Sequence, residues 1–118
     1  MAARFAELTA EIAAADRMFH PLAELNDLLT AASGGDILSL DPPSIADPYR
    51  LNYVTAMVEM AAHRARVVPP DWTRHVSPLR DPVFIDNSLA LRPHLLVASP
   101  PPFRRRNIFI DSSLGARV

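Results

Sequence analysis

The stretch that decides the fold is residues 47–70, DPYRLNYVTAMVEMAAHRARVVPP. Asp47 is a candidate N-cap, and Pro48 suits the first helical position because that position needs no backbone N–H donor. Apolar side chains recur on nearly every side of this segment, at Leu51, Tyr53, Val54, Ala56, Met57, Val58, Met60, Ala61, Ala62 and Ala65. We therefore predict a central, buried helix over 48–67 that Pro69-Pro70 ends.

Two further helical patterns precede this helix. The stripe over residues 2–19 consists of Phe5, Leu8, Ile12, Ala15 and Phe19, and the stripe over 21–32 consists of Leu22, Leu25, Leu28 and Leu29. Pro21 either kinks one long helix or begins a second one, and the sequence leaves both alternatives open. Gly34-Gly35 is a stop signal, so residues 34–47 are predicted to be a connector.

Prolines dominate the remainder of the chain. Eight of the twelve prolines lie after residue 68, which predicts irregular, extended structure. We expect a short helix near 93–98, a helical turn at 101–106 and a short strand at 108–110. The predicted fold class is mainly α: a small bundle of two to three helices in a platform (1–68), with a proline-rich, largely irregular arm (69–118), forming one structural unit.

Composition narrows the function. The 118 residues are the length of one domain, and the absence of cysteine excludes disulfides and thiolate metal sites. No apolar run reaches the length of a membrane span and no signal peptide is apparent, so we expect a cytoplasmic protein without membrane contact. The histidines show no metal-ligand spacing, and no nucleophile has an identifiable base. We therefore expect no enzyme activity, no cofactor and no metal.

The charges are unevenly distributed. Residues 1–68 hold five arginines and nine acidic residues, whereas 69–118 hold seven arginines and four acidic residues. Arg104, Arg105 and Arg106 are adjacent, and like charges in sequence need a carboxylate, a phosphate or water beside them. Three interpretations are open: the triplet contacts a protein partner, it contacts nucleic acid, or it pairs with acidic side chains of this chain.

The C-terminal half carries a series of motifs. They are PPDWT at 69–73, DPVF at 81–84, LRPHLL at 91–96, and SP at 99–100 followed by FRRRNIFI at 103–110. This order resembles a family of small bacterial proteins with the pattern PPxWT, xPxF and LRxxLLxxSPxxFRRRNIF. The resemblance covers about residues 55–118 and implies an antitoxin that silences a nucleotidyltransferase-like toxin in a two-gene module. Residues 1–50 carry no such resemblance, and their function stays open.

The leading hypothesis is therefore a non-enzymatic protein whose arm covers a partner's active cleft. The predicted partner-binding residues are Phe103, Arg104, Arg105, Arg106, Asn107, Phe109, Trp72 and Arg92. The aromatic side chains either insert into a partner groove or pack the arm onto the central helix. A homodimer is a further hypothesis, since three short helices offer more apolar surface than they hide from one another. The alternative functions are a DNA- or RNA-binding regulator and a structural subunit of a larger complex.

Overall fold

The computed structural model describes residues 1–85 and 99–110. Its elements in chain order are α1 (Ala2–Ala14), α2 (Phe19–Ala31), α3 (Gly34–Leu38), α4 (Pro48–Arg64), the 3-10 helix η1 (Asp71–His75), β1 (Val83–Phe84), α6 (Pro101–Arg104) and β2 (Ile108–Phe109). The protein is mainly helical, as the hydrophobic periodicity predicted.

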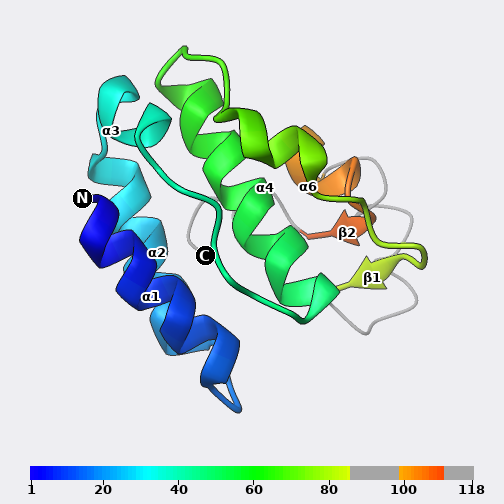
Figure 1. Ribbon diagram of the computed structural model, residues 1–118. Coiled ribbons are helices and arrows are strands. Elements are labelled where there is room, and N and C mark those ends of the chain that lie inside the picture. The colour runs from blue at the N-terminus through cyan, green and yellow to red at the C-terminus, as the bar shows by residue number, and fades with distance from the viewer. Residues whose placement is uncertain (86–98, 111–118) are drawn as a thin grey trace.

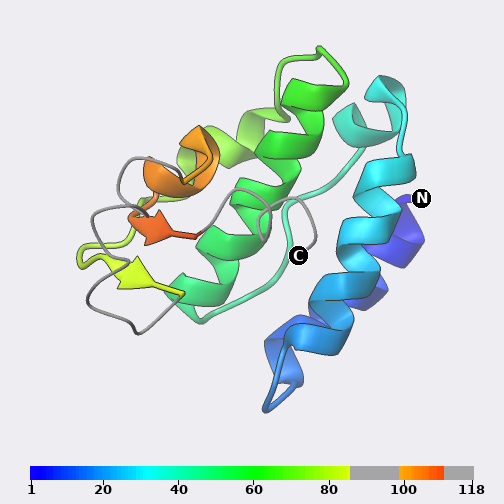
Figure 2. The same cartoon turned by 180° about the vertical axis from the view of Figure 1, so that it is seen from behind.

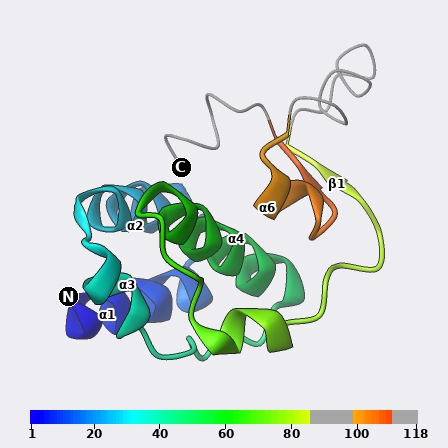
Figure 3. The same ribbon diagram turned by 90° about the horizontal axis from the view of Figure 1, so that it is seen from above.

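Helix α4 is the centre of the molecule (Figure 1). The pair α1 and α2 lies along one side of it, and α6 lies with the two strands on the other side, an order that the view from behind repeats (Figure 2). The core is assembled around α4 by apolar side chains from both sides, among them Phe5, Leu8, Ile12, Leu22, Leu25, Leu29, Val54, Val58, Ala62, Phe103, Ile108 and Ile110. Residues 99–110 therefore belong to the core of the fold, and Figure 3 shows α6 beside α4 from above.

The N-terminal boundary of α4 is the predicted one. The Asp47 side chain accepts a hydrogen bond from the backbone N–H of Tyr49, and Pro48 is the first helical residue. The C-terminal boundary lies three residues before the predicted one, because the chain turns at Arg66 in the left-handed conformation (φ 59°). The N–H of Val67 then bonds to the carbonyl of Ala62 at 3.0 Å, which closes the helix end.

Residues 2–31 form two helices, and the prediction that the first extends to residue 19 is wrong. Arg50 of α4 caps the end of α1, because its Nη1 donates to the carbonyls of Ile12 (2.6 Å) and Ala15. The stripe therefore stops at Ile12, and Phe19 opens α2 with 74% of its surface exposed. Pro21 lies in the first turn of α2, where the missing N–H breaks no helical hydrogen bond.

The predicted connector 34–47 contains a short helix, α3, that the glycines did not suggest. Ser33 and Asp36 cap its start reciprocally, each side chain accepting the other's backbone N–H at 3.1 Å. Ile37 and Leu40 then fix the connector to the core, and both are buried. Gly34 lies so close to the chain after α4 that an added Cβ would meet Val67 Cγ1 at 2.6 Å.

The two short strands pair in parallel. Val83 faces Ile108 and Phe84 faces Phe109 in the register. The predicted helical turn and strand in 101–110 are both present as α6 and β2. Neither η1 nor β1 was indicated by the sequence pattern, and the predicted helix near 93–98 lies outside the described residues.

Candidate functional site

Arg106 lies in the interior and joins three parts of the chain. Its Nε donates to Glu59 Oε1 at 2.7 Å, and its Nη1 donates to Asn52 Oδ1 at 2.9 Å. The remaining contacts reach backbone carbonyls, Val76 at 3.0 Å from Nη1 and Thr73 at 2.8 Å from Nη2. Only 6% of Arg106 is exposed. This side chain therefore anchors residues 99–110 to α4, to η1 and to Val76, the residue after η1.

The predicted aromatic contacts are also internal. Phe103 is fully buried and packs edge to face against Tyr53 of α4, with ring centroids 5.1 Å apart. Phe109 is 7% exposed and stacks on Phe84, also at 5.1 Å. Both aromatic side chains thus follow the packing alternative, because Phe103 packs on α4 and Phe109 packs on the neighbouring strand.

The other predicted contact residues divide as follows. Asn107 adopts the left-handed conformation (φ 63°) between α6 and β2, and its Nδ2 donates to the carbonyl of Leu79 at 2.6 Å. Trp72 is half-buried, with its Nε1 donating to the carbonyl of Leu40 at 2.9 Å. Arg92 lies outside the described residues. Asn107 and Trp72 are therefore both partly exposed, and each side chain also donates a hydrogen bond within the fold.

Arg104 and Arg105 differ from Arg106 because both are exposed. They end α6 and follow it, with Arg105 Nε donating to the carbonyl of Pro101 at 3.2 Å. Phe103 and Arg106 flank them and are buried, so the backbone that carries the two exposed guanidiniums is fixed from both ends. The structure thus separates the triplet into one anchor and two surface cations.

Arg105 lines two neighbouring hollows. The first, the α4–α6 groove, measures about 270 Å³ and is lined by Glu59, His63, Val67, Pro69, Pro101, Pro102 and Arg105. The second, the η1 hollow, measures about 200 Å³ and is lined by Glu59, Arg74, Val76, Pro78, Arg105 and Arg106. Glu59 is the acidic residue in both linings, and its carboxylate is bound to Arg106. Arg74 and Arg105 are the exposed guanidiniums in the two linings, and Arg74 is paired with Asp71.

A larger hollow of about 350 Å³ lies beside the strands. Its lining is apolar and aromatic: Met18, Phe19, Leu22, Tyr49, Tyr53, Val83, Phe84, Ile85 and Ile110. Burial raises the pKa of both tyrosines, and the Asp47 carboxylate adds to the rise for the Tyr49 pKa. The phenols are therefore held neutral, and this hollow offers apolar contact in preference to acid–base chemistry.

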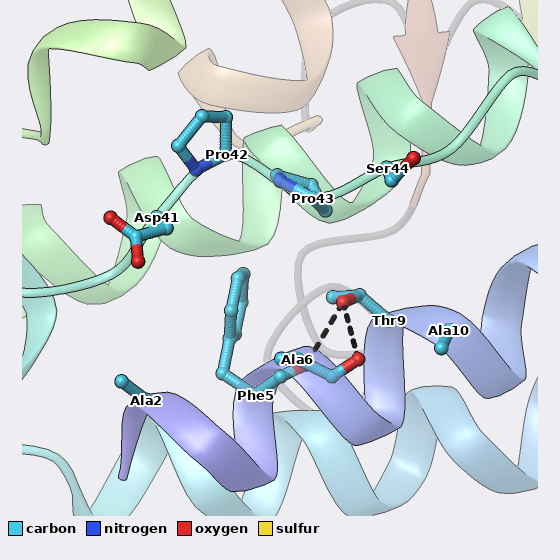
Figure 4. A pocket seen from close by; sticks show the side chains of 9 residues that line it. All are labelled: Ala2, Phe5, Ala6, Thr9, Ala10, Asp41, Pro42, Pro43 and Ser44. Atoms are coloured by element: carbon cyan, nitrogen blue, oxygen red, sulfur yellow. Dashed lines mark hydrogen bonds between the residues drawn. The ribbon is translucent and has the colours of Figure 1, made fainter.

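A further pocket of about 240 Å³ lies between α1 and residues 41–44 (Figure 4). The Phe5 ring rises from α1 toward Pro42 and Pro43 on the connector. The Thr9 hydroxyl is occupied within the helix, because it donates to the carbonyls of Phe5 (2.9 Å) and Ala6 (3.1 Å). Asp41 is the ionisable group of the lining, so the pocket has no partner for it in acid–base chemistry.

Within residues 1–85 and 99–110, no three side chains of the histidine, aspartate or glutamate type come together as metal ligands. In the same described ranges, no helix has both the length and the apolar character needed to cross a membrane.

Two residues of the anchor were missed by the sequence reasoning. Asn52 and Glu59 are polar positions on a helix that was expected to be buried, and both bind Arg106. Their spacing of seven places them on one side of α4, two turns apart. A polar stripe on a helix expected to be buried was the available signal, since buried polar groups need partners.

Comparisons of this chain with protein-family models, with curated proteins and with solved structures find no match.

Proposed function

We propose that this chain is a non-enzymatic, antitoxin-type protein that binds and neutralises a cognate toxin. Support comes from the motif series over residues 55–118 and from the fixed, exposed pair Arg104 and Arg105. The resemblance further suggests a nucleotidyltransferase-like toxin as the partner. In this proposal the contact surface is the exposed side of α6 and the residues around it.

The observation that carries the proposal is that Arg106 is buried whereas Arg104 and Arg105 are exposed. Buried Phe103 and Arg106 hold the backbone of residues 103–106 in place before any partner arrives. A preorganised surface loses less conformational entropy on binding than a mobile one. Arg104 and Arg105 are thus displayed as exposed cations from a fixed backbone, which suits protein recognition through charge-assisted hydrogen bonds.

The test is neutralisation in cells. The chain is expressed with the product of its adjacent gene, and growth is followed with the wild-type chain, with Arg105→Glu and with Arg17→Glu. Both arginines are exposed, so the two substitutions change the charge equally at distant places. We expect rescue by the wild type and by Arg17→Glu, and a loss of rescue with Arg105→Glu. An adjacent gene product without toxicity, or equal rescue by both variants, contradicts the proposal.

A nucleic-acid regulator is the competing function, because exposed Arg64, Arg74, Arg104 and Arg105 supply positive charge. The wider field is weak, since the whole chain carries a net charge of −1. Binding to DNA or RNA at physiological salt, with a steep decrease as salt rises, would favour this alternative.

A further inference from the structure

The α4–α6 groove and the η1 hollow share two lining residues, Glu59 and Arg105. They are therefore neighbours on one surface, with Arg105 at the boundary between them. At one end the combined surface includes His63 in the last turn of α4 and Val67 just after it. At the other end it includes Arg74 of η1 and Pro78. We refer to this combined surface as the Arg105 surface.

The lining of the Arg105 surface limits how a ligand can be held. Pro69, Pro101, Pro102 and Pro78 have no backbone N–H, so they cannot donate to a peptide laid beside them. Strand addition to these segments is therefore disfavoured. Recognition must come from apolar contact with the proline rings and from the side chains between them.

The charge of the Arg105 surface identifies the complementary group. Arg74 and Arg105 line it as exposed cations, whereas the carboxylate of Glu59 is bound to Arg106. Arg74 pairs with Asp71, but both members of this pair are more than 70% exposed. Exposed pairs of this kind contribute little, so Arg74 can exchange Asp71 for another carboxylate at low cost. The surface is complementary to carboxylates.

The dimensions favour side chains over a bound small molecule. Hollows of about 270 Å³ and 200 Å³ are smaller than the roughly 300–1,000 Å³ of typical small-molecule sites. Nucleic acid is less suitable, because two exposed guanidiniums in the lining are few for a phosphate backbone.

We propose that the Arg105 surface binds an acidic, extended segment of a protein partner, with one carboxylate held by Arg105 and apolar parts against the prolines. This proposal rests on the proposed function, since the segment belongs to the neutralised toxin, and it specifies the chemistry of that contact.

The test uses the full chain, labelled with ¹⁵N, and a blocked hexaglutamate peptide as the probe. We expect saturable shifts of the backbone amides of His63, Val67 and Arg105, and none of comparable size with blocked hexaglutamine. Arg105→Gln should weaken hexaglutamate binding at least tenfold, whereas Arg17→Gln should leave it unchanged. Shifts confined to other regions, or equal affinity of both variants, would overturn the proposal.

A second variant tests the groove without altering an arginine. His63→Trp places a large ring in the α4–α6 groove, and His20→Trp is its control because both histidines are exposed. With native circular dichroism for both, His63→Trp should weaken hexaglutamate binding at least fivefold and His20→Trp should not. Equal binding by the two variants would contradict the proposal that the α4–α6 groove binds the acidic segment. A 12-nucleotide single-stranded DNA that binds this surface tenfold more tightly than hexaglutamate would contradict it as well.

Failure of this proposal and failure of the proposed function are distinguishable. If the toxin is neutralised equally by wild type and by His63→Trp, the α4–α6 groove is excluded as the contact with the toxin, and the antitoxin function stands. If hexaglutamate binds at the Arg105 surface but the adjacent gene product is harmless, the surface stands and its partner is another acidic protein.

Discussion

Arg106 Nε and Glu59 Oε1 lie 2.7 Å apart and join side chains separated by 47 positions in the chain. Their contact brings the end of the chain's described part onto the middle of the central helix. It also gives three adjacent arginines different roles, because Arg104 and Arg105 remain exposed. The predictions below follow from this anchor and from the packing around α4.

Removing the Arg106 guanidinium should strongly destabilise the fold. Arg106→Met leaves the Glu59 carboxylate, whose side chain is 20% exposed, without its cation, and leaves Asn52 Oδ1 without a donor. Breaking such a buried pair costs about 3–5 kcal/mol. Urea unfolding followed by circular dichroism measures the change.

The exposed pair of Arg4 and Glu24 is the control for this prediction. Its side chains are 44% and 38% exposed, so Arg4→Met should change the free energy of unfolding far less than Arg106→Met does. The double variant Arg106→Met with Glu59→Met should recover part of the loss, because no charge is then left unpaired. Equal, small effects of Arg106→Met and Arg4→Met would exclude the anchor role.

Gly34 should not tolerate a side chain. A Cβ there would lie 2.6 Å from Val67 Cγ1, and valine has little rotamer freedom to move away. Gly34→Ala should cost about 1–3 kcal/mol, and Val67→Ala in the same chain should restore part of it. Gly35→Ala is the matched control, since its nearest neighbour is Ser33 Oγ at 3.9 Å. That variant should be neutral or more stable by about 0.5 kcal/mol. Similar losses for both glycines would contradict this packing.

Replacing Arg66 with glycine should stabilise the fold. Its φ of 59° is costly for a residue with a Cβ but not for glycine. Arg66→Gly should therefore raise the free energy of unfolding by up to about 1 kcal/mol. Arg64→Gly, at the last helical residue of α4, should lower it, because glycine is a poorer helix former than arginine. Thermal unfolding of the two variants distinguishes them, and a destabilised Arg66→Gly would show that this helix end is not formed as described.

The two tyrosines should remain neutral until the fold is lost in alkali. Burial raises the pKa of Tyr49 and of Tyr53 above the usual value of about 10. A raised pKa in the folded state means that stability is complete below the unfolded pKa and falls as pH rises above it. Since the chain has only two tyrosines, absorbance at the tyrosinate band reports on both. It should rise together with the loss of circular dichroism, and ionisation near pH 10 in an intact fold would contradict their burial.

Local signals in the sequence predicted the elements whose causes are local. Asp47 and Pro48 start α4 through contacts within one turn, and the apolar surface of that helix made it central. The end of α1 was not predictable in this way, because Arg50, 35 positions after Ala15, binds the last carbonyls.

The roles within the candidate site were also set by distant contacts. Arg105 and Arg106 are identical neighbours in the sequence, and distant partners on α4, Glu59 and Asn52, bind only the second of them. The same holds for Phe103, whose partner Tyr53 is on that helix. The motif directed attention to residues 103–110, but the assignment of anchor and surface residues within it required the folded chain.

The most direct test of the account compares Arg105→Gln with Arg106→Gln in two measurements, the thermal unfolding midpoint and the affinity for the neutralised toxin. We predict that Arg105→Gln keeps the wild-type midpoint and loses at least tenfold in affinity, whereas Arg106→Gln lowers the midpoint by several degrees. Wild-type affinity in a fully folded Arg105→Gln chain, or a wild-type midpoint for Arg106→Gln, would contradict the account.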